Sequence, residues 1–218
     1  MQKLSTEKPR NILIADDHAV VRRGLTQVLA DECAGAIIEE AATGQEAVDA
    51  VRRQAWDTVL LDINLPDKNG LEVLKEIKAV RPGLPVLILS HHAEEQYAAR
   101  AYKAGAAGYL TKNSAPDELS FAIRKVLAGG RYVSPSFAEQ IAGHLSSETV
   151  AAPHETLSDR EHLVLCEIAR GKAVSQIADE LFLSVKTVST YRARLLKKLH
   201  LSGNAELIRF AITQHLVE

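Results

Sequence analysis

The 218-residue sequence predicts a doubly wound α/β domain with a five-stranded parallel sheet, followed by an all-α module of four helices. Two observations predict this class. Between residues 10 and 130, short apolar runs alternate five times with segments of helical spacing, whereas from residue 157 onward only helical spacing remains. Strands that alternate with helices favour a parallel sheet covered on both faces, and right-handed crossovers leave few topologies besides the doubly wound one.

The first domain is expected over residues 8–130. Its predicted strands cover 11–16, 36–41, 58–63, 85–90 and 108–112, and its predicted helices cover 18–30, 44–54, 71–80, 94–105 and 116–129. A short helix over 134–145 follows, with Ser134 as N-cap and Pro135 at its first position. Small and polar residues then predict a linker, so residues 131–156 join the two domains.

The second domain is expected over residues 157–218, with helices at 158–171, 173–182, 184–201 and 204–218. Ser158 and Glu161 have the spacing of a capping box, and Ser184 is placed to cap the third helix. The apolar faces of the last three helices are predicted to contain Ile177, Ala178 and Leu181, then Val185, Val188, Leu195 and Leu199, then Leu207, Ile208, Ala211 and Ile212. The second and third of these helices, joined by the tight turn "LFLS", form a helix-turn-helix.

Charge and composition narrow the classes of function. The formal net charge is −2, but residues 186–198 contain five basic side chains and no acid, which predicts a local basic stripe on the third helix of the second domain. No apolar run approaches the length of a membrane helix, and "MQKLSTEKPR" lacks a secretory core, so a cytoplasmic protein is expected. Cys33 and Cys166 have no metal-ligand spacing and are interpreted as small buried hydrophobic residues.

Polar residues end the predicted strands of the first domain. Strand one ends in Asp16 and Asp17, strand three in Asp62, strand four in Ser90 and strand five in Lys112. A strand order of 2-1-3-4-5 brings the three carboxylates together, and such a cluster requires a cation, for which Mg²⁺ suits oxygen ligands. A carboxylate nucleophile, a divalent cation, an ammonium and a hydroxyl are the groups needed to receive a phosphoryl group. Taken singly, Asp16 could cap a helix and Asp62 could begin a turn.

The motifs "IADDH", "LLDINLPDKNG", "LILS" and "GYLTK", in this order and spacing, resemble the receiver domain of two-component response regulators, a flavodoxin-like fold. The resemblance implies that Asp62 is the phosphoacceptor. It also implies that Asp16, Asp17, Asp62 and the backbone carbonyl of Asn64 bind Mg²⁺, that Ser90 and Lys112 hold the phosphoryl oxygens, and that Tyr109 is an aromatic switch. The chain departs from many receivers at Asn113, where they have proline. His91 and His92 are interpreted as a polar loop above the site, in which His92 could influence the lifetime of the phosphate.

The segments "LSDREHLVLCEIARGK", "SQIADELFLSVKTVSTYRARLLKKLHL" and "AELIRFA" resemble the DNA-binding domain of LuxR-type regulators, so the whole chain resembles a NarL/FixJ-type response regulator. Ser189, Thr190 and Ala193 are expected to approach bases. Phosphates or groove walls are expected to meet Lys186, Thr187, Tyr191, Arg192, Arg194 and Lys198. Departures from the family at His162, Ser175, Gln176, Ser189 and Tyr191 prevent the transfer of a known operator sequence. Alternatively, 186–198 is only a solvated helix face.

The sequence is therefore interpreted as a cytoplasmic regulator of transcription that is not an enzyme, apart from loss of its own phosphoryl group. Its expected partners are a sensor histidine kinase, double-stranded DNA and a second copy of the chain. Three alternatives are kept: an aspartyl-phosphate phosphatase, a receiver that dimerises without phosphorylation, and a helical module that binds only proteins. The phosphatase is disfavoured because Asn64 cannot transfer a proton and no cap insertion is present.

Overall fold

The computed structural model describes residues 9–33, 35–92, 94–145, 153–214 and 216–217. The chain forms two compact units: residues up to His91 together with Ala101–Val133, and His92–Arg100 together with the chain from Ser134 onward. Residues 146–152 of the expected linker, and the expected first residue of the first domain, Lys8, lie outside the described residues.

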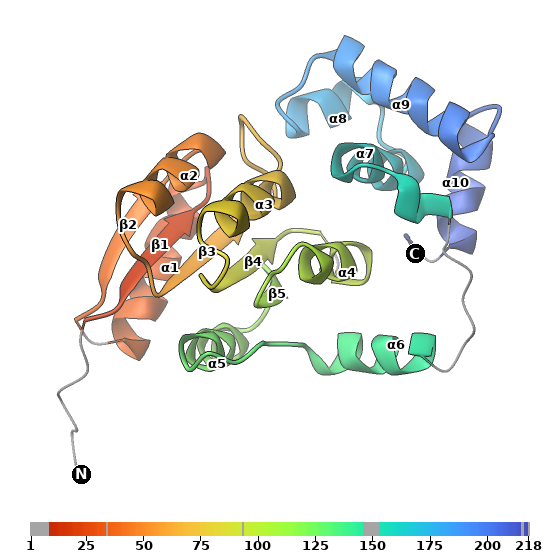
Figure 1. Ribbon diagram of the computed structural model, residues 1–218. Coiled ribbons are helices and arrows are strands. Elements are labelled where there is room, and N and C mark those ends of the chain that lie inside the picture. The colour runs from red at the N-terminus through yellow and green to blue at the C-terminus, as the bar shows by residue number, and fades with distance from the viewer. Residues whose placement is uncertain (1–8, 34, 93, 146–152, 215, 218) are drawn as a thin grey trace. The chain divides into compact units, whose positions relative to one another are not determined.

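The first unit is built on a parallel sheet in the order β2-β1-β3-β4-β5 (Figure 1). Its strands are β1 (Asn11–Ala15), β2 (Ile37–Ala41), β3 (Thr58–Asp62), β4 (Val86–Ser90) and β5 (Gly108–Thr111). The predicted sheet and its strand order are therefore confirmed. The order reverses between β1 and β3, and this is the point at which open α/β sheets bind ligands.

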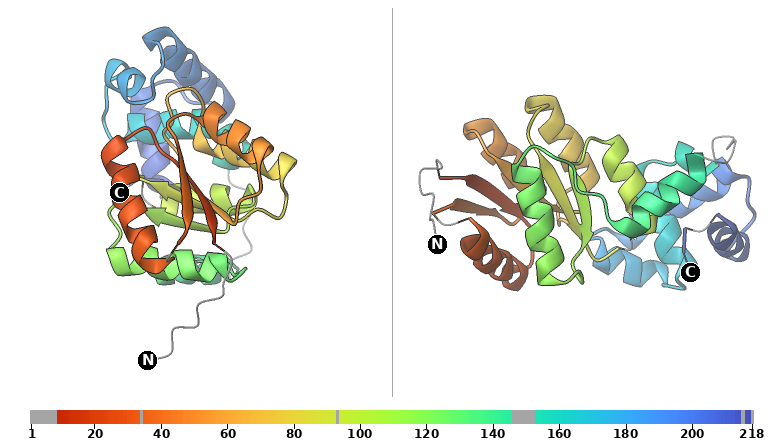
Figure 2. Two further views of the ribbon diagram at one scale, coloured as in Figure 1. Left: turned by 90° about the vertical axis from the view of Figure 1, so that its left-hand side faces the viewer. Right: turned by 90° about the horizontal axis from the view of Figure 1, so that it is seen from below.

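The helices cover both faces of the sheet. They are α1 (Ala19–Glu32), α2 (Gly44–Arg53), α3 (Gly70–Val80) and α5 (Pro116–Leu127). Helix α4 (Glu94–Lys103) belongs to the second unit up to Arg100. Helix α1 packs beside α5, and α2 packs beside α3. Figure 2 shows these two pairs on opposite faces of the sheet.

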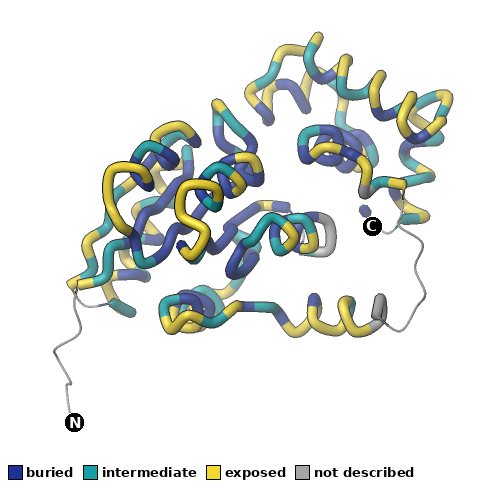
Figure 3. The backbone as a smooth tube through the Cα atoms, viewed as in Figure 1, coloured by how far each residue is buried: buried dark blue, intermediate teal, exposed yellow. Residues whose placement is uncertain are grey.

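Burial follows the position of each strand in the sheet. Every residue of β3 and β4 is buried (Figure 3), as expected of central parallel strands, which are covered on both faces and therefore read as nearly continuous apolar runs. The edge strand β2 is less buried, and 56% of Ile37 is exposed. The cluster of Ile12, Ile14, Leu25, Leu29 and Leu60 forms part of the core beneath α1.

The second unit contains α6 (Pro135–Leu145), a 3₁₀ turn η1 (Pro153–Thr156), α7 (Asp159–Ala169), α8 (Val174–Glu180), α9 (Val185–Leu199) and α10 (Asn204–Thr213). Helix α7 packs against α9 and α10, and α8 packs against α9. The four predicted helices of the helix-turn-helix domain are confirmed. The turn η1 was not predicted, because its small and polar residues read as linker.

Side-chain caps fix the starts of α7 and α9. The hydroxyl of Ser158 accepts a hydrogen bond from the backbone N–H of Glu161, whose carboxylate accepts one from the backbone N–H of Ser158, at 3.3 and 2.9 Å. The hydroxyl of Ser184 accepts from the N–H of Thr187 at 3.0 Å. Such caps satisfy backbone donors that have no partner within the helix, and both were predicted from the sequence.

Two predicted core residues of this unit are exposed. Val185 is 53% exposed because it is the first residue of α9, directly after the turn, and the buried face of α9 begins at Val188. Ile212 is 50% exposed because α10 packs through Leu207 and Ala211, and the next residue along a helix points about 100° away from its neighbour. The prediction for these two side chains was wrong.

Cys166 lies in α7 and is fully buried. Burial raises the pKa of its thiol to about 12, so the thiol stays protonated and behaves as a small hydrophobic group, as expected.

None of the helices in the described part of the chain has the length and apolar character needed to cross a bilayer.

Candidate functional site

The register of the sheet places two carboxylates side by side. Ala15 of β1 pairs with Leu61 of β3, so the residues that follow, Asp16 and Asp62, leave the same edge of the sheet together. Asp16 is 1% exposed and Asp62 is 2% exposed. The convergence expected from the strand order is thus present between two neighbouring strand ends.

Lys112 lies between these carboxylates. Ser90 of β4 pairs with Thr111 of β5, and the N–H of Lys112 donates to the carbonyl of Ser90 at 2.7 Å. The ammonium of Lys112 is 2.6 Å from Oδ2 of Asp16 and 2.6 Å from Oδ2 of Asp62. Two buried carboxylates therefore share one ammonium. The three side chains together keep one negative charge that no cation compensates.

Burial governs the protonation of this cluster. Burial raises the pKa of Asp62 to about 6; the charge of Lys112 opposes the rise, and the neighbouring charge of Asp16 adds to it. For Lys112, burial disfavours the ammonium, but the charge of Asp62 and the bonds to both carboxylates outweigh it and raise its pKa. Lys112 therefore remains charged, whereas Asp62 gains a proton more readily than an ordinary aspartate.

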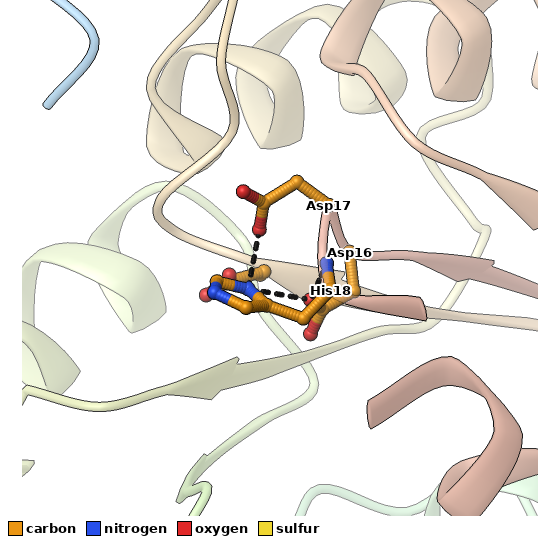
Figure 4. Close-up of side chains that lie close together, drawn as sticks. Asp16, Asp17 and His18 are labelled. Carbon is orange, nitrogen blue, oxygen red and sulfur yellow. Dashed lines mark hydrogen bonds and ion pairs between the residues drawn. The ribbon is translucent and has the colours of Figure 1, made fainter. Parts of the chain in front are cut away.

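The ring of His18 faces the carboxylate of Asp17 beside Asp16, as Figure 4 shows. The Nδ1 atom of His18 is 2.6 Å from Oδ1 of Asp17 and 3.4 Å from Oδ1 of Asp16. The backbone N–H of His18 also donates to Oδ1 of Asp16 at 2.9 Å. The N-cap position of α1 is His18, not Asp16, so Asp16 fixes the turn before the helix. The sequence pattern predicted no contact for His18, although this residue directly follows two aspartates.

The loop after β3 holds Asp62 in place. The N–H of Gly70 donates to the carbonyl of Ile63 at 2.7 Å, and Asn64 forms an isolated bridge with Asn69. The side chain of Asn69 caps α3 by accepting from the N–H of Leu71. A Cβ atom on Gly70 would lie 2.1 Å from the backbone oxygen of Asp62, so glycine is required for α3 to approach the strand end this closely.

The remaining expected residues of this site lie on the neighbouring strands. Ser90 is fully buried at the end of β4, and Tyr109 is fully buried on β5. His91 is exposed whereas His92 is buried. The prediction of a polar loop above the site therefore fits His91 and was wrong for His92.

The donor set fits a divalent cation. Asp16, Asp17, His18 and Asp62 each offer one ligand atom, and these atoms lie within 4.8 Å of one another. Carboxylate oxygens are the ligands that Mg²⁺ prefers, and the uncompensated negative charge beside Lys112 favours a cation.

The third helix of the second domain presents the expected basic surface. A surface hollow of about 310 Å³ lies at the N-terminal half of α9, lined by Ser184, Lys186, Thr187, Thr190, Tyr191 and Arg194. The residues expected to approach bases are all exposed, namely Ser189, Thr190 and Ala193. The hydroxyl of Thr190 donates to the carbonyl of Lys186 at 2.9 Å, so this threonine has its hydroxyl satisfied within the helix.

Two of the expected DNA-binding side chains hold the unit together. The Nε–H group of Arg192 donates to the side-chain oxygen of Asn204, at the start of α10. The ammonium of Lys198 is 2.6 Å from Oε2 of Glu161, a carboxylate that is 3% exposed on α7. These contacts link α9 to its neighbours, which the sequence pattern did not reveal.

Comparison with known families defines the class of protein. Residues 12–124 match the family model of the response regulator receiver domain, and residues 155–211 match that of the bacterial regulatory proteins of the luxR family. A receiver joined to a LuxR-type DNA-binding domain is the organisation of a DNA-binding response regulator.

Relatives over the full length agree. The chain is 38% identical over 207 residues to the response regulator UvrY of Escherichia coli K12, covering 94% of this chain and 95% of UvrY. It is 36% identical over 208 residues to the response regulator GacA of Pseudomonas aeruginosa PAO1, covering 95% and 97% of the two chains. The protein therefore belongs to the NarL/FixJ family of two-component response regulators.

Solved structures give the same fold. A LuxR-family two-component response regulator from Aurantimonas sp. SI85-9A1 is 35% identical and aligns with a TM-score of 0.59, covering 64% of this chain and all of that one. RcsB from Salmonella enterica serovar Typhimurium, bound to promoter P1flhDC in the presence of the phosphomimetic BeF₃⁻, is 25% identical with a TM-score of 0.63, covering 93% and 98% of the two chains.

Proposed function

We propose that this response regulator is switched by phosphorylation of Asp62, and that the phosphorylated form dimerises and binds DNA through α9 to regulate transcription. The observation that carries the proposal is the buried pair of Asp16 and Asp62 at adjacent strand ends, sharing the ammonium of Lys112. A pair of carboxylates that served only the stability of the fold would not be expected to leave one negative charge uncompensated, because an unpaired buried charge lowers the stability of the folded state.

The expected reaction is the transfer of a phosphoryl group from a phosphohistidine of a sensor kinase. A carboxylate oxygen of Asp62 attacks phosphorus and forms an acyl phosphate, while the P–N bond breaks and its electron pair stays on the imidazole nitrogen, which takes a proton from water. Lys112, already 2.6 Å from Asp62, is placed to pair with a phosphoryl oxygen, and Ser90 would donate its hydroxyl. A bound Mg²⁺, held by Asp16, Asp17, Asp62 and the backbone carbonyl of Asn64, would neutralise oxygen charge. Tyr109 would follow the movement of Ser90.

The DNA-binding surface is assigned to the exposed face of α9. Ser189, Thr190 and Ala193 would approach base edges in the major groove. Lys186, Thr187, Tyr191 and Arg194 line a hollow that can take a backbone phosphate. Arg192 and Lys198 would meet phosphates at the ends of this surface while keeping their contacts to Asn204 and Glu161.

The domain boundaries, the partners and the non-enzymatic role are proposed on the basis of these two sites. The receiver covers residues 8–130, residues 131–156 are the connection, and residues 157–218 are the DNA-binding domain. A sensor histidine kinase and double-stranded DNA are the partners, both met in the cytoplasm. The protein acts as a regulator and not as an enzyme, apart from hydrolysis of its own acyl phosphate.

Intact-mass measurement with a small-molecule phosphodonor and Mg²⁺ tests the acceptor. We expect one added phosphoryl group on the wild type and on Asp49→Asn, which changes an exposed carboxylate of α2, but none on Asp62→Asn. Equal labelling of Asp62→Asn would refute the assignment. No labelling of any variant, even by a kinase, would favour a receiver that dimerises without phosphorylation.

Salt dependence tests the α9 surface. We expect DNA affinity to fall steeply with salt, and Arg194→Ala to weaken binding and to lower the slope by about one phosphate contact. Arg23→Ala, on α1 of the receiver, is the matched control and should bind like the wild type. An Arg194→Ala protein with unchanged affinity and slope would show that DNA is bound without this face of α9. No salt-dependent DNA binding by the wild type would argue for a helical module that binds proteins alone.

A further inference from the structure

The turn between α8 and α9 places a phenylalanine in a backbone conformation that favours glycine. Helix α8 ends in a Schellman motif, in which the N–H of Phe182 donates to the carbonyl of Asp179 at 3.3 Å and the N–H of Leu183 donates to that of Ala178 at 2.8 Å. The residue that follows the C-cap of such a motif is left-handed, and Phe182 accordingly has a φ of 53°. A bulky side chain is disfavoured in this conformation.

Other helix ends of the chain follow the usual preference. The same pair of hydrogen bonds closes α4, α5 and α7, and the left-handed residue at those three ends is glycine, namely Gly105, Gly129 and Gly171. Among the described residues, the other non-glycine residue with a positive φ is His200, after α9, and histidine is one of the residue types enriched in this conformation. The geometry of the helix end therefore does not explain a phenylalanine at position 182.

Packing within the domain does not explain this side chain either. Phe182 is 53% exposed, and Val185, three residues further along the chain, is also 53% exposed. A large apolar side chain left in water forgoes the stabilisation that burial would give, and strained backbone conformations cluster where a binding partner is met. Two apolar side chains thus border the start of α9 without being used fully by the fold.

The surrounding residues indicate which partner these side chains meet. Ser184 and Lys186 flank Val185, and both line the hollow at the N-terminal half of α9. Val185 also lies one turn before the exposed Ser189 along the helix. Residues 181–198 contain no acidic side chain, which suits a polyanion.

The chemistry of the major groove offers an apolar group for such side chains. In a helix-turn-helix, the N-terminal residues of the recognition helix contact base edges. Of the four bases, thymine alone presents a methyl group in the major groove, and apolar side chains, phenylalanine included, contact it there. We propose that Phe182 and Val185 form an apolar edge of the DNA-binding surface and determine specificity by contacting thymine methyl groups. This inference rests on the proposed function in taking α9 as the helix that reads DNA.

A glycine at position 182 separates the needs of the fold from those of binding. Phe182→Gly relieves the left-handed backbone of its side chain, so this variant should unfold at a denaturant concentration no lower than that of the wild type. Its affinity for a DNA site selected with the wild type should nevertheless fall by about tenfold, because the apolar contact is lost. A variant that is clearly less stable and binds DNA normally would show that Phe182 serves the fold.

Replacement of thymine by deoxyuridine tests the methyl contact directly. Each thymine of the selected site is replaced in turn, and affinity for the full chain is measured by fluorescence anisotropy with phosphodonor present. We expect at least one replacement to weaken wild-type binding by about fourfold, the effect of one methyl group returned to water. The same replacement should leave the affinity of Phe182→Gly or of Val185→Ala unchanged, because the side chain that met the methyl group is gone.

Val80→Ala is the matched control. Val80 is a valine at the C-terminal end of α3 that is 37% exposed, so this variant should keep the wild-type affinity and the wild-type response to deoxyuridine. An equal response of all the proteins to every replacement, or no replacement that weakens wild-type binding, would overturn the proposal. So would a Phe182→Gly protein that binds DNA normally but supports less transcription, because Phe182 would then meet a protein partner.

The salt dependence of the same samples distinguishes two kinds of failure. If the wild type shows no salt-dependent DNA binding, the α9 surface of the proposed function fails, and the roles of Phe182 and Val185 fail with it. If Arg194→Ala weakens binding but no thymine methyl group matters, only the roles of Phe182 and Val185 are lost.

Discussion

At the scale of single residues, Asp62 is placed where its charge is costly to the fold. Its side chain is buried beside a second carboxylate, and both rely on one ammonium. Functional groups are commonly held in such unfavourable environments, because the binding partner supplies the missing charge. Stability and function should therefore be opposed at this position.

We expect Asp62→Asn to be more stable than the wild type at neutral pH in the presence of a chelator. The pKa of Asp62 is raised from 3.8 to about 6, so the folded wild type loses stability as pH rises from about 4 to 6 and stays weakened above that range. The gain from the variant should be on the order of 3 kcal/mol at pH 7 and should vanish near pH 4. Denaturant unfolding at both values of pH measures it.

The opposite outcome, a less stable Asp62→Asn at pH 7, would mean that pairing with Lys112 outweighs desolvation. Asp49→Asn on α2 should show no gain at pH 7, because the hydrogen bond from Gln45 lowers the pKa of the Asp49 carboxyl, so that its charge favours the folded state at neutral pH.

At Thr190, the hydroxyl is used within α9, where it donates to the carbonyl of Lys186. The methyl group is then the part left to contact a base, for which the thymine methyl is the matching partner. Against a site selected with the wild type, we expect Thr190→Val to bind within about threefold and Thr190→Ser, which keeps the hydroxyl, to lose about 1 kcal/mol or more. Fluorescence anisotropy compares them; a reversed order would show that the hydroxyl reads the base.

At the scale of elements, the approach of α3 to the end of β3 depends on Gly70. A Cβ atom there would lie 2.1 Å from a backbone atom of Asp62 and 2.6 Å from one of Ile63. Moving these backbone atoms away would distort the end of β3 and cost stability. We expect Gly70→Ala to cost about 1–3 kcal/mol of stability and to reduce phosphorylation. Gly24→Ala, within α1 and with nothing within 4 Å of the added atom, should instead be neutral or stabilising by up to about 1 kcal/mol. Thermal unfolding of the pair measures the contrast, and similar effects of the two changes would contradict it.

The link between α7 and α9 is a second element-scale feature. Lys198 pairs with Glu161, and this pair and Ser158 lower the pKa of Glu161 against the effect of burial. Lys198→Met would leave a buried carboxylate without its cation, so we expect a loss of about 1–3 kcal/mol. Glu161→Gln with Lys198→Met should recover part of the loss, because no unpaired charge remains. Failure of the double variant to recover stability would mean that Lys198 acts through packing.

Much of this organisation was predictable from the sequence, for a physical reason. Carboxyl ends of parallel strands share one edge, so Asp16, Asp62, Ser90 and Lys112 could be brought together without knowing any distance. The pattern could not place Val185 and Ile212, because helical spacing does not say where the partner helices end. Nor did it reveal the contacts of His18, Arg192 and Lys198, which depend on backbone direction and on residues distant in sequence.

At the scale of the whole molecule, the protein joins an acceptor site to a DNA-reading helix in one chain. In the proposed function the receiver would change charge when Asp62 takes a phosphoryl group. A change of charge can act on DNA binding only by favouring one of two states of the chain. The proposed dimerisation would supply such a state, because two copies of α9 would bind two half-sites. DNA affinity should therefore depend on Asp62.

DNA binding with and without phosphodonor is the most direct measurement of that dependence. Fluorescence anisotropy on a selected site should show affinity rising at least about tenfold when the wild type is phosphorylated in the presence of a divalent ion, with no rise for Asp62→Asn. Sedimentation of the same samples should show dimers only for the phosphorylated wild type. Equal affinity of both proteins, with and without the donor, would contradict the account and leave a DNA-binding protein whose receiver is not a switch.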